Sequence, residues 1–464
     1  MEEESFRDHI STVDQDGKRV WVYPKKPKGW WTNKRTIVSY LLLAFLFAAP
    51  FLTINGNPFI MLNVVERKFS LLGVLFWPQD FYLFVIAMLT MLVCIVLFTV
   101  VFGRIFCGWI CPQTIFMEMV FRKIEYAIEG DWQKQMALNK APWDAIKIAK
   151  KTTKHILFYI LSFIISNLFL IYIINKTEWY KIISDDPANH TGGLSIILVF
   201  SLVFYWIYSN FREQVCTTVC PYGRMQGVML DRNSIVVAYD HVRGENRAKL
   251  SKDENREEVG KGDCIDCHHC VHVCPTGIDI RNGVQLECIN CTACIDACDD
   301  IMLKINKPKG LIRYASEEGI TNNIPLQWTR RSIAYTAVLT VLTTALMVLL
   351  FTRADTETVI LRTPGILYQE RPNHQISNLF NYKIINKTNY SYPIHFKIEN
   401  IEGSIEFISS KTPVLKSGEI SEGTFFIIID ENKLSSIKTK IKIGVYHDDK
   451  LLETIKTNFI GPSI

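Results

Sequence analysis

The sequence predicts a mixed membrane protein, in which an α-helical membrane bundle carries a cysteine-rich insert and is followed by a C-terminal β-sandwich. Three observations lead to this fold class. Five apolar runs are long enough to cross a bilayer, twelve of the 13 cysteines fall in two connections between those runs, and short alternating runs follow residue 353. A composition of 48% hydrophobic and 21% charged residues excludes a disordered chain.

The membrane helices are predicted from runs that contain no charged residue. A helix rises about 1.5 Å per residue and the hydrocarbon layer is about 30 Å thick, so about 20 apolar residues suffice for one crossing. The runs cover residues 36–54, 81–102, 156–174, 194–211 and 332–352. We expect the first run to remain as an anchor and not as a cleaved signal peptide, because 35 residues precede it and no clear small-residue cleavage site follows it.

Lysine and arginine counts predict the orientation, because these residues stay on the cytoplasmic side during insertion. Residues 1–35 hold eight and residues 103–155 hold nine, whereas 55–80 and 175–193 hold two each. In a bacterial inner membrane we expect a cytoplasmic segment 1–35, a transmembrane core 36–240, a cytoplasmic insert 241–331, a fifth span 332–352 and a periplasmic domain 353–464. The net charge of +5 follows from this topology and does not indicate nucleic-acid binding.

The insert contains the spacing CxxCxxCxxxC twice, from Cys264 and again from Cys288. Two such runs are typical of bacterial two-cluster ferredoxins, in which the fourth cysteine of each run binds the other [4Fe-4S] cluster. Paired zinc sites are the alternative, but zinc ribbons separate their CxxC pairs widely. We expect cluster one at Cys264, Cys267, Cys270 and Cys298, and cluster two at Cys274, Cys288, Cys291 and Cys294. Asp299 stands where the ferredoxin pattern has proline, and we expect polar loop roles for His268, His269 and His272.

Four further cysteines form two CxxxCP motifs, at residues 107–112 and 216–221. Each motif follows two apolar runs, so we interpret the core as a duplicated two-helix unit whose motifs meet at the cytoplasmic membrane surface. Cysteines at i and i+4 of a helical turn share one face, and soft thiolates select Cu(I). The candidate soft-metal ligands are Cys107, Cys111, Cys216 and Cys220.

Two other interpretations of these four cysteines stay open at this point: a dithiol redox pair, or small buried apolar residues. Nearby methionines could add thioether ligands, although packing is the usual role of methionine in such segments. These methionines are Met117, Met119, Met225 and Met229. Cys94 lies inside the second apolar run and is expected to be inert.

The combination of five spans, two CxxxCP motifs, a two-cluster insert and a cysteine-free tail resembles the CcoG/FixG/RdxA family of membrane iron–sulfur proteins, which are cytochrome c oxidase accessory proteins. The resemblance covers essentially the whole chain. It implies a part in the assembly of cbb3-type oxidases and reduction of Cu(II) to Cu(I) on the cytoplasmic side. It also implies that the CxxxCP cysteines are associated with copper and that the insert cysteines hold the clusters. The partners would be the oxidase or its assembly factors.

The tail from residue 355 alternates apolar and polar residues in short runs such as 382–388, 394–400, 424–430 and 437–447. This spacing predicts a β-sandwich. The tail has no cysteine, so an immunoglobulin-like domain here depends on its core alone, and the tail of the resembled family is likewise described as immunoglobulin-like. Docking of another periplasmic protein and a purely structural cap are both open roles.

Three functions are compatible with these motifs. The favoured one is a cupric reductase, in which a cytosolic donor or a quinol supplies the clusters and electrons pass to Cu(II) near the CxxxCP motifs. The second is a quinol-oxidising relay, like the membrane polyferredoxin subunits of periplasmic nitrate reduction. The third is a non-catalytic copper carrier or assembly scaffold. We expect no nucleic-acid partner, and a homo-oligomer stays open.

Overall fold

The computed structural model describes residues 12–462, apart from gaps at 15, 17, 55, 64–67, 78–79, 252–255, 257, 324–327, 366, 389, 409–412, 417 and 435. Residues 1–11 of the expected N-terminal segment therefore lie outside the described part. The chain forms two compact units. Unit 1 comprises Met1–Ala49, Ile86–Ile171 and Lys176–Thr344, and unit 2 comprises Pro50–Val85, Tyr172–Asn175 and Ala345–Ile464.

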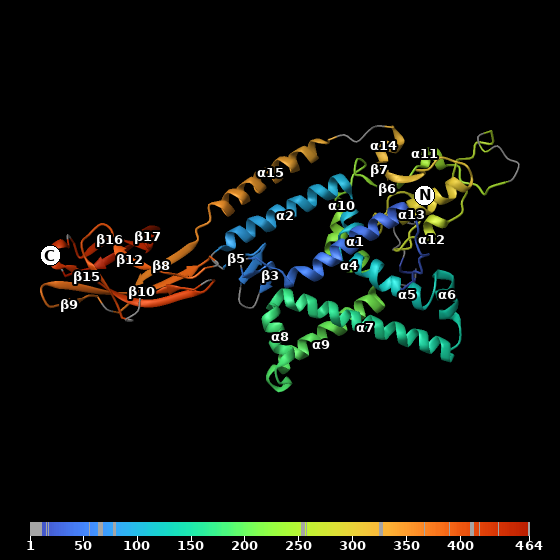
Figure 1. Ribbon diagram of the computed structural model, residues 1–464. Coiled ribbons are helices and arrows are strands. Elements are labelled where there is room, and N and C mark those ends of the chain that lie inside the picture. The colour runs from blue at the N-terminus through green and yellow to red at the C-terminus, as the bar shows by residue number, and fades with distance from the viewer. Residues whose placement is uncertain are drawn as a thin grey trace. The chain divides into compact units, whose positions relative to one another are not determined.

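Within the described residues, five helical segments are long and apolar enough to cross a membrane, as predicted (Figure 1). They contain α1 (Trp30–Ala48), α2 (Phe81–Phe102), α7 (Ala145–Ile174), α9 (Thr191–Trp206) and α15 (Arg330–Phe351). Helices α1 and α7 begin earlier than the uncharged runs, and charged residues that precede those runs in each helix have partners inside unit 1. Arg35 Nε donates to the Gly108 carbonyl at 2.6 Å, and Lys154 Nζ lies 2.9 Å from Glu129 Oε1.

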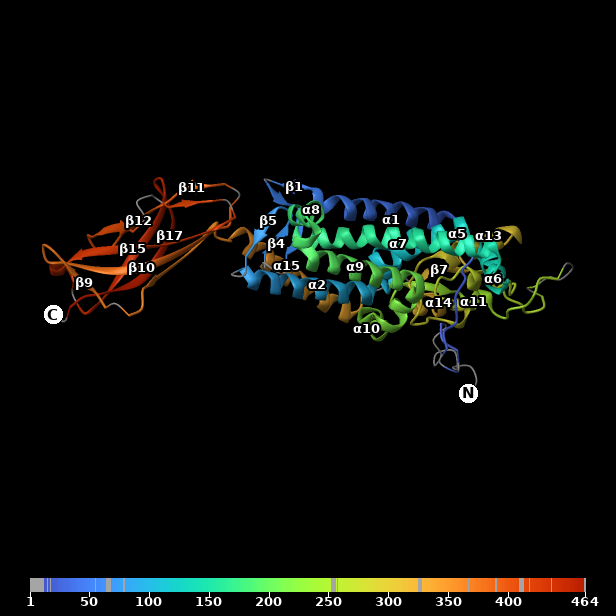
Figure 2. The same ribbon diagram turned by 90° about the horizontal axis from the view of Figure 1, so that it is seen from below.

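Helices α1, α7 and α9 pack around an aromatic core. Phe116, Phe121, Phe158 and Tyr208 are almost fully buried there, and Leu43 of α1 packs against them. Helices α7 and α9 lie side by side at this core (Figures 1 and 2). The short connecting helices are α3 (Ile105–Trp109), α4 (Pro112–Ile115), η3 (Phe116–Phe121), α5 (Arg122–Ile128), α6 (Trp132–Lys140), α8 (Lys176–Ser184), η5 (Ile207–Phe211), η6 (Val215–Val219) and α10 (Pro221–Met229).

The cysteine-rich insert is a small α/β structure within unit 1. Strand β6 (Val236–Tyr239) pairs antiparallel with β7 (Ile312–Ala315). Between them lie α11 (His241–Gly244), α12 (His269–His272), η7 (Ile280–Asn282) and α13 (Ala293–Lys304). The buried core combines Val237, Ile278, Ile295, Met302 and Leu311 with several of the cysteines. The insert thus surrounds its thiols with apolar side chains.

Unit 2 contains the predicted β-sandwich. One sheet has the order β13–β15–β10–β8, with β9 also paired to β10, and the other has the order β12–β16–β17. Phe380, Phe425, Ile427, Ile441 and Ile443 are fully buried in the core that the two sheets share. The strands are β8 (Thr356–Arg362), β9 (Gln369–Arg371), β10 (Gln375–Asn386), β12 (His395–Ile398), β13 (Ser404–Phe407), β15 (Ile420–Asp430), β16 (Lys438–His447) and β17 (Lys450–Ile460).

Unit 2 also contains a small antiparallel sheet of β3 (Ile60–Asn63), β4 (Lys68–Leu71) and β5 (Val74–Phe76), which sequence analysis did not predict because its strands are too short to show a pattern. The buried Asp80 follows this sheet and lies 2.6 Å from Arg353 and 2.7 Å from Lys387. Burial alone would raise the pKa of Asp80, but the two cations lower it below its usual value. Asp80 therefore joins three segments that are remote in sequence.

Candidate metal centre

The eight insert cysteines line two cavities. The first cavity is lined by Cys264, Cys267, Cys270 and Cys298 among apolar side chains. The second is lined by Cys274, Cys288, Cys291 and Cys294, and Cys270 also contacts it. These are the two sets that the spacing predicts, each joining three cysteines of one run to the fourth of the other. Among the eight, Cys267 is the exposed thiol.

Burial is the main influence on the pKa values of these thiols. It raises the pKa of Cys270 and Cys288 to about 12 and that of Cys291 to about 11. Such a thiol gives up its proton when a cation takes the place of that proton, so buried thiols grouped in an apolar cavity suit a metal-bound state. Four sulfur donors to each cavity fit the requirement of two [4Fe-4S] clusters.

The polar residues among these cysteines have protein partners. Arg281 Nη2 lies 2.6 Å from Asp279 and 2.9 Å from Nδ1 of His268. His272 stacks on Trp132, with 4.8 Å between the ring centroids. Asp299, at the position of the expected proline, accepts a hydrogen bond from the Gly310 amide at 2.9 Å. These side chains stabilise the cysteine loops through contacts with the protein.

The two CxxxCP motifs share one local structure. A short helical turn, α3 or η6, holds the first cysteine, and the second cysteine caps the helix that begins at the proline, α4 or α10. Cys111 and Cys220 have extended ψ angles of 122° and 113°. The expectation of a single helical turn through both cysteines is therefore wrong, because proline disfavours the helical conformation for the residue before it.

The four motif thiols lie near one another. Burial and the neighbouring Cys111 raise the pKa of Cys107 to about 11 and that of Cys216 to about 12. Cys107 Sγ donates to Gln226 Oε1 at 3.1 Å, and Arg104 Nε donates to the same oxygen at 3.0 Å. In the described part of the chain, no three Cys, His, Asp or Glu side chains are grouped as they would be around one metal ion.

The first CxxxCP motif packs directly against the second cysteine run of the insert. Cys107 shares one buried cluster with Ile289 and Cys291. A side chain at Gly108 would overlap the carbonyl oxygen of Ile289 and crowd the backbone of Asn290. Glycine lets these two backbones approach closely, and the two cysteine regions meet there.

Helix α1 is attached to the insert at its first turn. Asp296 of α13 accepts hydrogen bonds from the amides of Trp31 and Thr32, at 3.1 and 2.7 Å. A carboxylate at a helix N-terminus satisfies free amides and is favoured by the helix dipole. Because Asp296 lies between Cys294 and Cys298 in the sequence, this contact ties the first membrane helix to both cysteine sets.

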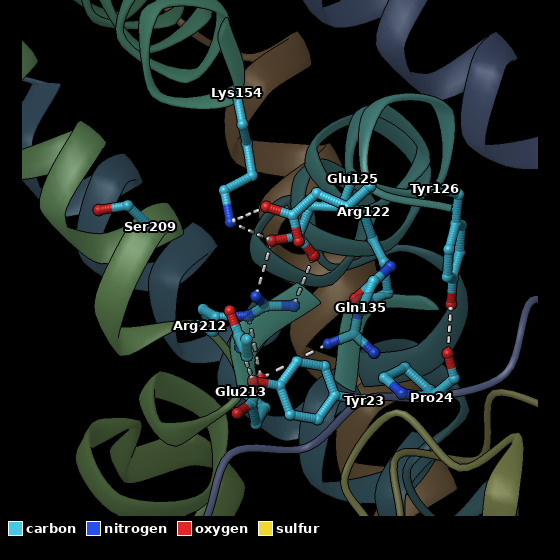
Figure 3. Close-up of polar contacts among 12 residues, drawn as sticks. Tyr23, Pro24, Arg122, Glu125, Tyr126, Gln135, Lys154, Ser209, Arg212 and Glu213 are labelled. Atoms are coloured by element: carbon cyan, nitrogen blue, oxygen red, sulfur yellow. Dashed lines mark hydrogen bonds and ion pairs between the residues drawn. The ribbon is translucent and has the colours of Figure 1, made fainter. Parts of the chain in front are cut away.

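A buried ionic network connects the segment after the first CxxxCP motif to the segment before the second (Figure 3). Glu125 accepts two hydrogen bonds from Arg212, at 2.8 and 2.9 Å, and lies 3.7 Å from Lys154. Arg122 lies 3.5 Å from Glu213. Burial alone would raise the pKa of Glu125, but the surrounding cations lower it below its usual value. Each segment thus supplies one arginine and one glutamate to the other.

Sequence analysis missed Arg35, Arg104, Gly108 and Gln226. The two arginines border apolar runs, and a charged residue at such a position is the sequence signal that could have found them. Of the four candidate methionines, Met117 and Met119 are buried in the helical core, Met225 is exposed and Met229 is partly exposed. Cys94 is exposed on α2.

Three family models match the chain. A 4Fe-4S dicluster domain matches residues 211–317, which hold the second CxxxCP motif and the eight insert cysteines. A 4Fe-4S binding domain matches residues 84–130, which include Cys107 and Cys111. The IG-like fold at the C-terminus of FixG matches residues 346–462. The protein class is therefore a membrane iron–sulfur electron-transfer protein with an immunoglobulin-like domain.

The family follows from the curated relatives. RdxB of Cereibacter sphaeroides is 34% identical over 388 residues, which cover 80% of each chain. The chain is also 34% identical to FixG of Rhizobium meliloti and 35% identical to RdxA of Cereibacter sphaeroides, and the matches cover 67% and 64% of it but only 60% and 62% of those proteins. The chain belongs to the FixG/RdxA family, as its motifs predict. A solved FixG-related protein from Vibrio parahaemolyticus is 18% identical, covers 23% of this chain and 97% of its own, and has a TM-score of 0.20, too low for an argument.

Proposed function

We propose that the chain reduces Cu(II) to Cu(I) at the cytoplasmic face of a bacterial inner membrane, in support of the assembly of a cbb3-type cytochrome c oxidase. The observation that carries this proposal is the packing of Cys107 and Gly108 against Ile289 and Cys291. It puts the proposed copper-associated thiols beside the second set of insert cysteines. An electron at the second cysteine set would therefore be close to the thiols of the first CxxxCP motif.

Each group of cysteines has a separate role in this proposal. The two insert sets hold the clusters, and [4Fe-4S] clusters supply one-electron transfer when bound. The apolar side chains around them keep water out. The four motif thiols receive Cu(II) as substrate and stabilise Cu(I), because soft thiolates prefer the reduced ion. One electron converts Cu(II) to Cu(I), so no side chain has to move a proton in this step.

The finer organisation belongs to the same proposal. The segments 1–35, 36–240, 241–331, 332–352 and 353–464 are taken as the five parts, with the N-terminus cytoplasmic, the last part periplasmic and the core duplicated. The similar backbone angles of Cys111 and Cys220, each followed by a helix that begins at proline, support the duplication. A cytosolic carrier or a quinol supplies electrons, and the periplasmic domain docks the oxidase or one of its assembly factors.

Anaerobic stopped-flow mixing of the dithionite-reduced chain with Cu(II) tests the reaction. We expect cluster absorbance to recover its oxidised form as a Cu(I)-specific chelator reports Cu(I), and we expect Cys107→Ser and Cys216→Ser to slow this about tenfold or more, since each removes a soft ligand. Cys94→Ser is the matched control, because Cys94 lies outside both motifs and should leave the rate unchanged. Clusters that stay reduced after mixing with Cu(II) would contradict the proposal.

A competing role for the motif thiols has support from the 4Fe-4S binding domain that matches residues 84–130. In that role, Cys107, Cys111, Cys216 and Cys220 hold a further iron–sulfur cluster and copper does not bind them. Iron analysis of the same variants separates the two. Under the copper proposal Cys107→Ser keeps all of its iron, and loss of iron from this variant would assign the motif to a cluster.

A further inference from the structure

Two buried arginines lie where the first CxxxCP motif meets the second set of insert cysteines. Arg35 of α1 has 4% of its surface exposed, and Arg104, just after α2, has 3%. A guanidinium keeps its charge in a protein, and burying it away from water is costly unless an opposite charge compensates. Each of these buried guanidinium groups therefore needs an opposite charge nearby.

Neither arginine has an acidic partner among the described residues. Arg35 Nε donates to the Gly108 carbonyl at 2.6 Å, and its buried Nη2 has no hydrogen-bond partner. Arg104 Nε donates to Gln226 Oε1, the oxygen that also accepts from Cys107. Both contacts are to neutral oxygens. The positive charges are thus left uncompensated by carboxylates.

Both arginines lie beside the cysteines of this junction. Arg104 Nε donates to Gln226 Oε1, the oxygen that also accepts from Cys107 Sγ. Arg35 binds the carbonyl of Gly108, the residue after Cys107, and Cys107 belongs to the same buried cluster as Cys291. Gly103, the residue before Arg104, lies so close to Asn290 that a Cβ there would be 3.2 Å from the Asn290 side chain.

The arginine beside the first cysteine set has carboxylate partners. Arg281 lines its cavity, but the guanidinium binds Asp279 at 2.6 and 2.8 Å and also contacts Asp266. Two carboxylates therefore compensate this cation. The second set has two uncompensated cations beside it, and the first has a cation whose charge is neutralised.

We propose that Arg35 and Arg104 are the counter-charges of the second cysteine set and the adjoining CxxxCP thiols, and that they make the group held by Cys274, Cys288, Cys291 and Cys294 easier to reduce than the group held by the first set. This inference rests on the proposed role of the eight cysteines as cluster ligands. A cluster held by the second set would then be the favoured electron acceptor, on the side of the motif. Extra negative charge after reduction is stabilised by nearby cations.

Anaerobic potentiometric titration of the purified full-length chain, followed by EPR, tests this inference without copper. We expect two one-electron couples. Arg35→Gln and Arg104→Gln should each lower the more positive couple by about 59 mV, which corresponds to about a tenfold lower ratio of reduced to oxidised cluster at a given potential. The other couple should stay in place. Arg35→Lys and Arg104→Lys, which keep the charge, should recover most of the shift.

Arg232→Gln is the matched control, because Arg232 is a surface arginine with 76% of its side chain exposed, and both couples should stay unchanged. The inference would be overturned if Arg35→Gln and Arg104→Gln kept their full iron content and left both redox potentials unchanged. A shift in the potential of the more negative couple would also overturn it. If the glutamine variants lose iron, retention of iron by the lysine variants supports a charge role, and loss from both contradicts it. A wild-type chain with clusters that do not reduce Cu(II) would overturn the proposed function alone.

Discussion

Gly108 shows how a single residue controls the distance between two cysteine regions. It lies between Cys107 and Trp109, and no side chain separates its backbone from that of Ile289 and Asn290. The Gly108 carbonyl also accepts the Arg35 hydrogen bond at 2.6 Å. One position thus combines a close backbone approach with the attachment of a buried cation.

Replacing Gly108 with alanine tests this contact. A Cβ atom would overlap rigid backbone atoms, and such overpacking costs about 1–3 kcal/mol. We expect Gly108→Ala to lower the thermal unfolding temperature and the iron content of the purified chain. Gly192→Ala is the matched control, since a Cβ there contacts nothing within 4 Å. Equal stability and iron content in the two variants would show that the close approach is dispensable.

At the scale of elements, short helices and turns position the motif cysteines. Proline begins α4 and α10 and places the preceding cysteine in an extended conformation. The ionic network then holds α5 against the residues before η6, through Glu125 with Arg212 and Arg122 with Glu213. Uncharged apolar runs predict the long helices, but the pair of Glu125 and Arg212 joins residues 87 positions apart, which no local pattern predicts.

We expect Glu125→Gln to destabilise the helical unit by about 3–5 kcal/mol, because it removes the buried carboxylate that accepts both hydrogen bonds from Arg212 and leaves that guanidinium only the longer contact with Glu213 at 3.6 Å. The double variant Glu125→Gln with Arg212→Gln should recover part of this loss, since it removes one unpaired charge as well. Thermal unfolding in detergent measures both. Glu178→Gln is the control: its pair with Lys181 is about half exposed and should matter by about 1 kcal/mol or less. Additive losses in the double variant would show that the pair is not coupled.

At the scale of the whole molecule, unit 2 is assembled from three parts of the chain. Its sandwich follows from alternation in the tail, but Asp80, from a different connection, binds both Arg353 and Lys387. Arg353 Nη2 also donates to the Leu75 carbonyl at 2.6 Å. These contacts attach the small β3–β5 sheet to residues of the tail within the same unit.

The lowered pKa of Asp80 predicts that unit 2 loses stability in acid. Its folded pKa is lower than the unfolded value of about 3.9, so its stabilisation is present above about pH 4 and disappears as the pH falls through the folded pKa. Asp80→Asn should destabilise the unit by about 3–5 kcal/mol at pH 7 and flatten the loss of stability below pH 4. Thermal unfolding of the full chain from pH 7 to pH 3 measures this. Glu402→Gln, at an exposed pair with Lys433, should leave the profile unchanged. A variant profile that runs parallel to the wild type would contradict the assignment.

The two cysteine patterns differ in how far the sequence could describe them. The grouping of the insert cysteines into two sets follows from the CxxCxxCxxxC spacing, because both runs lie on one short segment with few ways to fold. The CxxxCP motifs were placed together by their repeat, but their conformation was not predicted correctly. The proline at position 112 carries that information, through its effect on Cys111.

By itself the sequence determined the five apolar helices, the cysteine-rich insert and the β-sandwich of the tail. The helices follow from the length of the uncharged runs, the insert from its cysteine spacing and the sandwich from alternation, all of which are patterns within short segments. Only the tertiary structure decided that Cys107 and Gly108 meet Ile289, that Arg35 and Arg104 lack carboxylate partners among the described residues, and that Asp80 binds Arg353. Such contacts join residues remote in sequence, and packing of the whole chain, not local pattern, selects them.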